Sequence, residues 1–290
     1  MPFFSIVIPS YNRAEYLHLT IESIQDQLFQ DWECVIIDDG STDNSAEIVQ
    51  EIIQNDARIK YIYQENAERS VARNNGIKNS SGEYICFLDS DDLYKENHLQ
   101  VLFENIHISE NKISLFFVNQ TILIENREEK CSTITYYSSP DYFIENSIIP
   151  VRVCIHRDIF KSYSFDQRIV IVEDAVLWTQ IARHFPIFHI EVDTVIYRWH
   201  DDNSVNIKNN CFLPRLKGLD ILFESKEMRQ YISRKMRNKA IGNCYYGIAK
   251  HYSYKRNFIK MCIFIFRSIL RDLKCKQNKA KIYMIYEYFR

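Results

Sequence analysis

The chain has little glycine and lacks the short glycine-containing motifs that mark several common enzyme classes. It has six glycines and six prolines in 290 residues. No G-x-G-x-x-G, Walker A or G-x-S-x-G sequence occurs among them. Those motifs place backbone N–H groups or a nucleophile against the substrate. Their absence therefore removes the main support for a dinucleotide-binding, P-loop or serine-hydrolase enzyme.

Paired cysteines and a long apolar segment are also missing. The eight cysteines contain no C-x-x-C pair, so we expect neither a zinc site nor a disulfide framework and interpret them as reduced and structural. The longest apolar run of the tail, 261–266, is too short to cross a bilayer. The first residues lack the basic leader of a signal peptide. We therefore expect a cytoplasmic protein.

The charges are divided unevenly along the chain. Residues 208–290 carry 20 Lys and Arg against 5 Asp and Glu, whereas the residues before them carry 16 basic and 33 acidic side chains. Such asymmetry predicts two functional regions. We place an acidic body at 1–208 and a basic helical region at 209–290.

The first hundred residues alternate short apolar runs with helical patterns, which predicts βαβ units on a parallel sheet. Strands are expected at 5–8, 34–37, 59–63, 84–88, 113–138, 153–155 and 187–199. Helices are expected around 17–28, 48–53, 70–78, 99–106 and 173–184, and throughout the chain beyond 211. Open parallel sheets bind ligands at the carboxyl ends of their strands. The polar clusters at those ends are therefore the candidate site.

Three carboxylates follow the apolar run 85–88 in a single loop. They belong to Asp89, Asp91 and Asp92, and Ser90 lies among them. Mg²⁺ and Mn²⁺ prefer oxygen ligands, often one or two carboxylates together with substrate phosphates. A helix N-cap needs only one carboxylate, so three at a strand end favour a ligand site. Asp92 alone is also explained as the cap of the following helix.

Polar residues close the other expected strands as well. Asp39 can accept from a base or a ribose hydroxyl, or belong to an ordinary turn. Tyr11 and Arg13, after the first strand, can stack on a base and face a phosphate, although a plain turn explains them almost as well. Arg73 lies one helical turn from Arg69, and its guanidinium suits a phosphate, a uracil carbonyl or a surface ion pair.

A second acidic motif opens the helix expected at 173–184. Asp174 shares a helical face with Trp178, which suits a general base beside an aromatic platform for a sugar. An acid at a helix N-terminus is also favoured by electrostatics alone. His200 closes the last expected strand, where it can reach a metal or a diphosphate or be merely structural.

In this order the motifs resemble the signature of family 2 glycosyltransferases with the GT-A fold. The matching segments are 5–13, 35–43, 72–77, 87–92 and 173–174, and the resemblance extends over residues 3–204. It implies an α/β, Rossmann-like, mixed and mostly parallel sheet flanked by helices, with a C-terminal helical appendage. It also implies an inverting enzyme that uses Mn²⁺ or Mg²⁺. The expected reaction moves a sugar from a nucleotide-diphosphate sugar, most simply a UDP-sugar, to a glycan or lipid-linked glycan hydroxyl in surface polysaccharide synthesis.

The resemblance assigns roles residue by residue. The donor-binding residues are Pro9, Tyr11, Arg13, Asp39, Arg73, Asp89 and Ser90. Asp91 and His200 would hold the metal, Asp174 would be the catalytic base, and Glu173 and Trp178 would contact the acceptor. Two positions depart from the family pattern. The loop at 67–70, which is often glycine-rich in the family, has the sequence Ala-Glu-Arg-Ser here. Val172 stands where a glycine commonly precedes the Glu-Asp pair.

The tail has the pattern of a basic amphipathic helix. Its basic positions are spaced by 4, 7, 4 and 3 residues: Arg256, Lys260, Arg267, Arg271 and Lys274. The opposite side is expected to be apolar: Ile259, Cys262, Ile263, Phe266, Ile269, Leu270 and Leu273. Segment 255–275 is expected to lie on an anionic membrane, peripheral to the inner face of the plasma membrane, or to pack on the body with its cations in water. No nucleic acid partner is expected.

Two other functions fit part of the pattern. The run 87–93 resembles the nucleophile strand of a haloacid-dehalogenase phosphatase or phosphotransferase, but that hypothesis leaves Asp39 and Arg73 unexplained. A non-catalytic sugar-nucleotide binding module would use the donor residues and would have no need of a base at Asp174.

Overall fold

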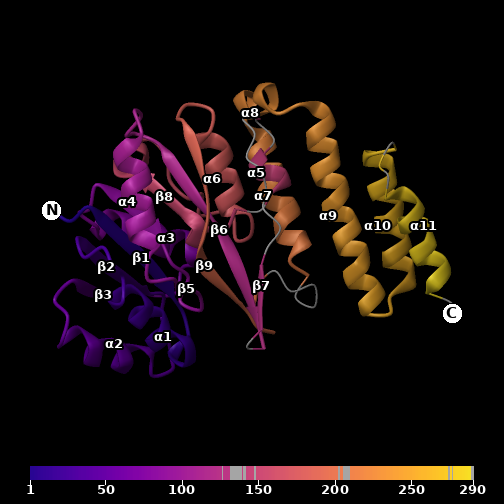
Figure 1. Ribbon diagram of the computed structural model, residues 1–290. Helices are drawn as coiled ribbons and strands as arrows, with labels where there is room; N and C mark the ends of the chain where they lie inside the picture. The colour runs from indigo at the N-terminus through magenta and orange to yellow at the C-terminus, as the bar shows by residue number, and fades with distance from the viewer. Residues whose placement is uncertain are drawn as a thin grey trace. The chain divides into compact units, whose positions relative to one another are not determined.

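The computed structural model describes residues 1–125, 127–130, 139, 142–146, 148–201, 203–204, 210–273, 275 and 277–288 (Figure 1). The chain divides into two compact units. The sheet unit comprises residues 1–138, 148–167 and 180–200, and the helical unit comprises 139–147, 168–179 and 201–290. The boundary predicted between 208 and 209 lies outside the described residues and stays a prediction.

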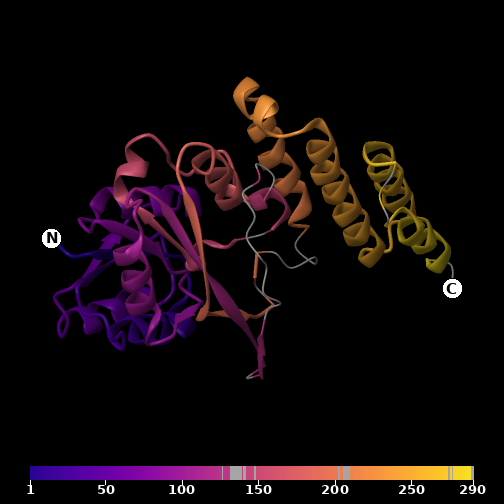
Figure 2. The same cartoon turned by 45° about the horizontal axis from the view of Figure 1, so that its top comes forward.

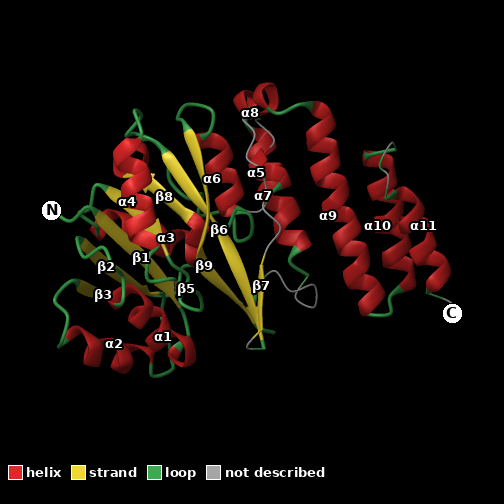
Figure 3. Cartoon of the chain, in the orientation of Figure 1, coloured by secondary structure: helices red, strands yellow, loops and turns green. Residues whose placement is uncertain are grey.

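Nine strands within the described ranges form one mixed sheet, in the order β3-β2-β1-β4-β8-β6-β9-β5 with β7 paired to β6 (Figure 3). They are β1 (Phe4–Ser10), β2 (Trp32–Asp38), β3 (Ile59–Tyr63), β4 (Tyr84–Phe87), β5 (Leu93–Tyr94), β6 (Leu115–Ile124), β7 (Arg127–Lys130), β8 (Val153–His156) and β9 (Ile187–Trp199). The first four strands run parallel, β8 is antiparallel to β4 and β6, and β9 is parallel to β6. This confirms the predicted α/β fold class.

The parallel strands β1, β2 and β4 are buried on both faces, because helices cover each side of the sheet. Alternate residues of a strand point to opposite faces. Ile6 and Ile8 of β1 and Ile36 of β2 join the main core with α1 (Ala14–Gln25), α2 (Ser45–Ile53) and α4 (His98–Ile108). Val35 and Ile37 of β2 pack on the other face, against Ala72 of α3 (Arg69–Asn79).

Helix α3 lies unusually close to β1 because Gly76 faces the strand. A Cβ atom at Gly76 would come within 2.3 Å of Val7 Cγ1, so only glycine fits there. This close approach brings the first turns of α3, including Arg73, near the carboxyl ends of the central strands.

Several local expectations need correction. The two-residue strand β5 was not predicted, because a run of two residues carries no periodic signal. Leu28 lies beyond the end of α1 and is 60% exposed, so it does not belong to the helical stripe. The N-cap of α4 is Asn97, so Asp92 does not cap this helix. Segment 113–138 contains β6 and β7, and residues 131–138 lie outside the described residues.

The helical unit contains α5 (Tyr142–Glu145), most of α6 (Glu173–Ile181), α7 (Phe212–Glu224), α8 (Lys226–Tyr231), α9 (Arg234–Tyr254), α10 (Phe258–Arg271) and α11 (Asn278–Glu287). Short 3₁₀ helices at Pro150–Arg152 and Arg157–Lys161 belong to the sheet unit. Leu219, Leu222 and Cys244 are among the buried residues that join α6 to α9, and Met261 and Ile265 join α10 to α9. Figure 2 shows α9, α10 and α11 running alongside one another.

Most apolar positions predicted for the tail are not packed against the protein, and the alternative in which they lie on a membrane stays a prediction. Five of the apolar positions are 45–72% exposed, namely Ile259, Ile263, Phe266, Leu270 and Leu273. The buried side of α10 is formed by Met261, Ile265 and Ser268, because these residues face α9 and α11. Arg256 precedes the helix, and Lys274 lies outside the described residues.

Within the described part of the chain, no helix has both the length and the apolarity needed to cross a bilayer. The seven cysteines of that part are free thiols, and Cys131 lies outside it.

Candidate active site

The polar segments predicted from the sequence follow three neighbouring parallel strands. Because β1 lies between β2 and β4, the segments that begin after these strands meet at one edge of the sheet. A hydrogen bond of 2.8 Å from the Asp39 N–H to the Ser10 carbonyl joins two of them. This is the edge at which open parallel sheets bind ligands.

Asp91 lies at the centre of this edge, and two side chains converge on one of its oxygens. Arg13 Nε lies 3.3 Å and His200 Nε2 3.0 Å from Asp91 Oδ2. Tyr16 stacks on the His200 ring, with centroids 5.0 Å apart and planes inclined by 18°, which restricts how the imidazole turns. The structure therefore brings together three predicted residues that follow β1, β4 and β9.

Arg73 and Asp89, both expected to bind the donor, form an ion pair with each other. Arg73 Nη2 lies 2.7 Å from Asp89 Oδ1. The Arg73 side chain is 2% exposed and also packs over the Phe165 ring, whereas the Asp89 side chain is 27% exposed. Arg73 thus reaches the carboxylate from inside the protein, and Asp89 is the member of the pair that a ligand can contact.

The backbone of the acidic loop is held by two residues that the sequence did not single out as site residues. Thr20 Oγ1 lies 3.0 Å from the carbonyl oxygens of both Ser90 and Asp92. Arg198 Nη2 donates to Thr20 Oγ1 at 2.8 Å, and its Nε donates to the Asp91 carbonyl. Ser90 itself is 5% exposed. No sequence pattern indicates such a role for Thr20 on the preceding helix. For Arg198 there is a signal, because it lies two residues before His200, which was predicted as a site residue.

Asp92 is buried and joins the loop to β9. The Arg198 N–H donates to Asp92 Oδ1 at 2.9 Å. Burial raises the pKa of Asp92 well above its usual range, and Asp91 and Asp89 add to this shift. Burial lowers the pKa of Arg198, while Asp92 and Asp91 oppose that effect. Asp92 therefore positions the end of β9 so that His200 reaches Asp91.

Asp39 is fixed at the end of β2 by two hydrogen bonds. Its Oδ1 accepts from Gln64 Nε2 at 2.6 Å and from the Ala67 N–H at 2.9 Å. Gly40 follows in the left-handed region with a φ of 82°, where glycine is favoured. At the neighbouring strand end, Tyr11 is 48% exposed and Pro9 is half-buried.

The acidic pair Glu173 and Asp174 begins α6 in the helical unit. Glu173 is buried, Asp174 is half-buried, and the Trp178 ring has no exposed surface, so in this structure it packs inside the protein. The preceding residue, Val172, has a φ of 70°, which a β-branched residue adopts only under strain. The position therefore keeps the conformation for which the family commonly uses glycine.

The residues around Asp91 fit a divalent cation. Asp91 and His200 offer a carboxylate and an imidazole that already meet within 3.0 Å, and Mn²⁺ accepts both ligand types. A cation shared with substrate phosphates needs only one or two protein carboxylates. In the described ranges, no group of three or more His, Cys, Asp and Glu surrounds a metal position.

The mixed sheet with its acidic edge defines the class of proteins that have the GT-A fold. The chain belongs to glycosyl transferase family 2, because the model of that family matches residues 5–170, more than half of the chain.

Comparisons with known proteins place the chain near bacterial glycosyltransferases. It is 43% identical over 102 residues to the glycosyltransferase GlyA of Streptococcus pneumoniae, covering 35% of this chain and 15% of that protein. It is 29% identical over 225 residues to the Escherichia coli UDP-Glc:alpha-D-GlcNAc-diphosphoundecaprenol beta-1,3-glucosyltransferase WfgD, covering 75% of this chain and 84% of that protein. The chain spans 15–40% of the length of the first three curated relatives that it matches.

Solved structures share the fold at low sequence identity. Staphylococcus aureus TarS 1–349 in complex with UDP-GlcNAc matches with a TM-score of 0.64 and 16% identity, covering 99% of this chain and 89% of that one. The Pyrobaculum calidifontis mannosyltransferase PcManGT in complex with GDP-Man and Mn²⁺ matches with a TM-score of 0.61 and 11% identity, covering 99% and 85%. At these identities the likeness shows the fold alone.

Proposed function

We propose that the protein transfers a sugar from a nucleotide-diphosphate sugar to a hydroxyl of a glycan or lipid-linked glycan, with inversion at the anomeric carbon, in surface polysaccharide synthesis. The observation that supports this most is the meeting of Arg13 and His200 on Asp91, beside the Arg73–Asp89 pair. Such an arrangement would suit a cation bound beside the Asp89 carboxylate at the ligand edge of the sheet.

The nucleoside would bind across the ends of β1, β2 and β4. The exposed ring of Tyr11 is available to stack on a base, and the fixed Asp39 carboxylate can accept from a base or ribose donor. Asp89, whose carboxylate is ion-paired with the buried Arg73, would accept a hydrogen bond from a hydroxyl of the ribose or of the sugar. Arg13, already beside Asp91, would face the diphosphate.

Asp91 and His200 would hold a Mn²⁺ or Mg²⁺ ion together with the diphosphate of the donor. The cation, when bound, offsets the negative charge of the departing diphosphate. Arg13 and Tyr16 contribute by fixing the Asp91 carboxylate and the His200 ring before the donor arrives. The Mn²⁺ present with GDP-Man in the mannosyltransferase of the same fold supports this choice of ion.

Asp174 would act as the general base. As the acceptor oxygen forms its bond to the anomeric carbon, the bond from that carbon to the diphosphate oxygen breaks and its electron pair leaves with the nucleotide. The hydroxyl proton passes to the Asp174 carboxylate. Attack on the face opposite the leaving group inverts the anomeric carbon without a covalent intermediate. The assignment is supported by the Glu173-Asp174 motif and by the half-buried position of Asp174 at the start of α6.

A UDP-sugar is the donor we expect, and a diphosphate-linked lipid the carrier of the acceptor. The support is the UDP-GlcNAc bound to TarS and the name of WfgD, which gives a UDP-Glc donor and a diphosphoundecaprenol-linked acceptor.

The proposal is tested by incubating the chain with UDP-, GDP- and dTDP-sugars and model acceptors, and determining the anomeric configuration of the product by NMR. An α-linked donor should give a β-linked product. Asp174→Asn should keep donor affinity while the transfer rate falls about 10²–10⁴-fold, since a general base contributes about that much. A retained anomer would contradict the inverting mechanism, and undiminished transfer by Asp174→Asn would contradict the base assignment.

A further inference from the structure

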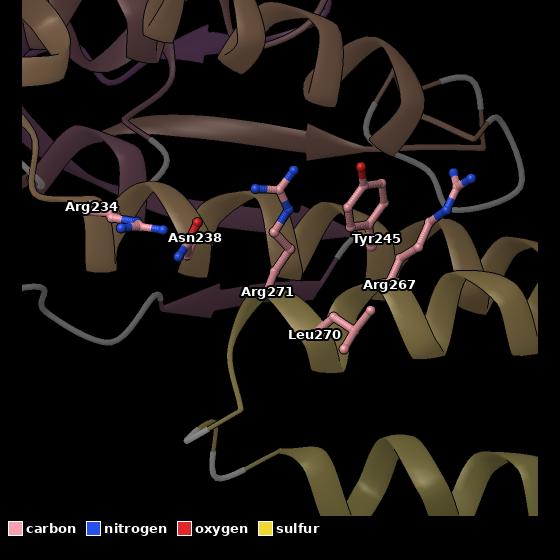
Figure 4. A pocket seen from close by; sticks show the side chains of 6 residues that line it. All are labelled: Arg234, Asn238, Tyr245, Arg267, Leu270 and Arg271. Carbon is pink, nitrogen blue, oxygen red and sulfur yellow. The ribbon is translucent and has the colours of Figure 1, made fainter.

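The helical unit contains a basic cavity that the proposed reaction does not use. It has a volume of about 400 Å³ and lies between α9 and α10. Its lining residues are Arg234, Asn238, Tyr245, Arg267, Leu270 and Arg271. Figure 4 shows the Arg267 and Arg271 side chains rising from α10 on either side of the Tyr245 ring, and Arg234 extending toward Asn238. No acidic residue lines this cavity.

The cavity is built by the close packing of two helices. The Ser268 hydroxyl donates to the Gly242 carbonyl at 2.6 Å, so α9 and α10 touch at this point. A Cβ atom at Gly242 would lie 3.5 Å from the Arg271 Cβ, which shows that Arg271 leaves α10 beside the contact. Arg267 lies one turn earlier on the same face of α10. The contact between α9 and α10 thus fixes the backbone positions from which the Arg267 and Arg271 side chains extend.

Within the described residues, the three arginines of the cavity, Arg234, Arg267 and Arg271, form no ion pair with a carboxylate. Asp220 on α7 is near enough for Arg271 to lower its pKa, although packing around that carboxyl raises the pKa more strongly. Arg267 instead lies 5.3 Å and 6.0 Å from the Phe264 and Tyr245 ring centroids. Like charges that line one cavity repel one another, and an anion bound among them removes that repulsion.

Another cavity of the helical unit shows the contrasting arrangement. It has a volume of about 320 Å³ and is lined by both Lys239 and Glu145, which form an ion pair. One of its two cations is therefore paired within its lining, since Arg215 is the other, whereas no carboxylate lines the arginine cavity.

We propose that the arginine cavity binds a phosphate or diphosphate group. Guanidinium forks match the spacing of phosphate oxygens and bind them with paired hydrogen bonds. The Tyr245 hydroxyl and the Asn238 amide are further donors in the same lining. The cavity belongs to the helical unit, whereas the acidic edge belongs to the sheet unit.

The exposed apolar row beside the cavity favours a phosphate carried on a lipid. Leu270 lines the cavity and also belongs to the row formed with Ile259, Ile263, Phe266 and Leu273, spaced by 4, 3, 4 and 3 residues. Such a row is one face of a helix, and these side chains are 45–72% exposed. An apolar face next to bound phosphate suits a lipid whose chains lie along α10.

The test measures binding of the full chain, without divalent cations, to inorganic pyrophosphate and to vesicles of phosphatidylglycerol or phosphatidylcholine. Arg267→Gln and Arg271→Gln should each weaken binding about tenfold, because each removes a charge-assisted fork. Arg271→Lys, which keeps the charge without the fork, should lose less. Arg256→Gln is the matched control, because Arg256 is an exposed arginine just before α10 that does not line the cavity.

Each outcome of this experiment either supports the proposed phosphate site or overturns it. A selective loss for phosphatidylglycerol vesicles supports the site and identifies a lipid phosphate, and a selective loss for pyrophosphate supports it and identifies a free phosphate. Equal losses in Arg256→Gln and Arg271→Gln would overturn the proposal, because binding would then reflect only the diffuse positive charge of the tail. Failure of the unmodified chain to bind either probe would overturn it as well. Thermal unfolding of each variant separates loss of a site from loss of folding.

Discussion

The two units of the protein hold their charges in different ways. In the sheet unit, Arg73 is paired with Asp89, and Asp92 receives a hydrogen bond from Arg198. In the helical unit, Arg267 and Arg271 extend into a cavity without an ion-paired carboxylate among the described residues. Ion-paired side chains fix the geometry of a site before the ligand binds, whereas the cavity arginines would be neutralised only by a bound anion. Variants of these paired residues of the sheet unit should therefore lose stability, whereas variants of the cavity arginines should lose ligand affinity.

The two largest expected effects on stability are those of Glu33→Gln and of Arg73→Gln, which is compared with Arg271→Gln below. Glu33 is buried at β2, where Ser5 Oγ and Lys60 Nζ donate to it at 2.6 and 2.7 Å and the Gly82 N–H donates at 3.2 Å. Burial alone raises its pKa, but the hydrogen bonds from Lys60, Ser5 and Ser81 outweigh burial and bring the pKa to about 2. The variant should lose about 2–3 kcal/mol of unfolding free energy at pH 7.

The same residue predicts a pH dependence. A carboxyl whose pKa is lowered by folding stabilises the protein fully above its unfolded value and loses that contribution as the pH falls toward its folded value. The unfolding free energy of the unmodified chain should therefore fall between pH 4.5 and about 2 more steeply than that of Glu33→Gln. Denaturant titrations across this range measure the difference, and parallel curves would show that Glu33 is not held as an ion.

His200→Asn should weaken Mn²⁺-dependent donor binding about 10–100-fold with little change in stability, as losses around metal ligands commonly do. His200 has a 14% exposed side chain and meets Asp91 at 3.0 Å, so its loss removes a ligand without opening the core. Calorimetry measures the affinity and thermal unfolding the stability. An unchanged Mn²⁺ dependence would mean that His200 only positions Asp91.

Glu68→Gly should stabilise the sheet unit by about 1 kcal/mol, the balance of relieved strain and the entropy cost of glycine. Glu68 is exposed and adopts φ 73° and ψ 157°, a conformation that is nearly restricted to glycine. Its side chain has no packing to lose. Glu65→Gly is the matched control, since Glu65 is also exposed but has no positive φ. Equal effects of the two variants on the midpoint of thermal unfolding would contradict this account.

The smallest expected effect on stability is that of Arg271→Gln, below about 0.5 kcal/mol, as for exposed surface positions that form no ion pair among the described residues. Arg73→Gln provides the contrast. It leaves the Asp89 carboxylate without its buried partner and should cost about 3 kcal/mol. Denaturant unfolding compares the two arginines directly. Similar losses would remove the distinction between the two units.

The central part of the fold could be predicted because its signals are local. Short apolar runs that alternate with helical patterns identify the parallel strands, and the structure places β3 at the predicted residues, Ile59–Tyr63. The pairing of Arg73 with Asp89 could not be predicted, because it depends on how closely Gly76 lets α3 approach β1. Thr20 and Tyr16 were missed for a similar reason, since only the folded sheet brings α1 beside the acidic loop.

The helical unit was harder to predict, because amphipathic spacing does not reveal which side of a helix is covered. The spacing of α10 correctly separated two faces, but Met261, Ile265 and Ser268 form the buried one and Ile259 and Phe266 are exposed. Backbone strain could not be predicted from the sequence either. The sequence showed that glycine was missing before Glu173, but only the structure shows that Val172 keeps a φ of 70°.

The most direct test of the central claim is a calorimetric titration of the full chain with UDP-sugars, with and without Mn²⁺, for the unmodified protein, Asp91→Ala and Asp174→Asn. We expect Mn²⁺-dependent binding by the unmodified protein and by Asp174→Asn, and its loss in Asp91→Ala. Unchanged Mn²⁺ dependence in Asp91→Ala, or no binding of any UDP-, GDP- or dTDP-sugar by the unmodified chain, would contradict the proposed donor site.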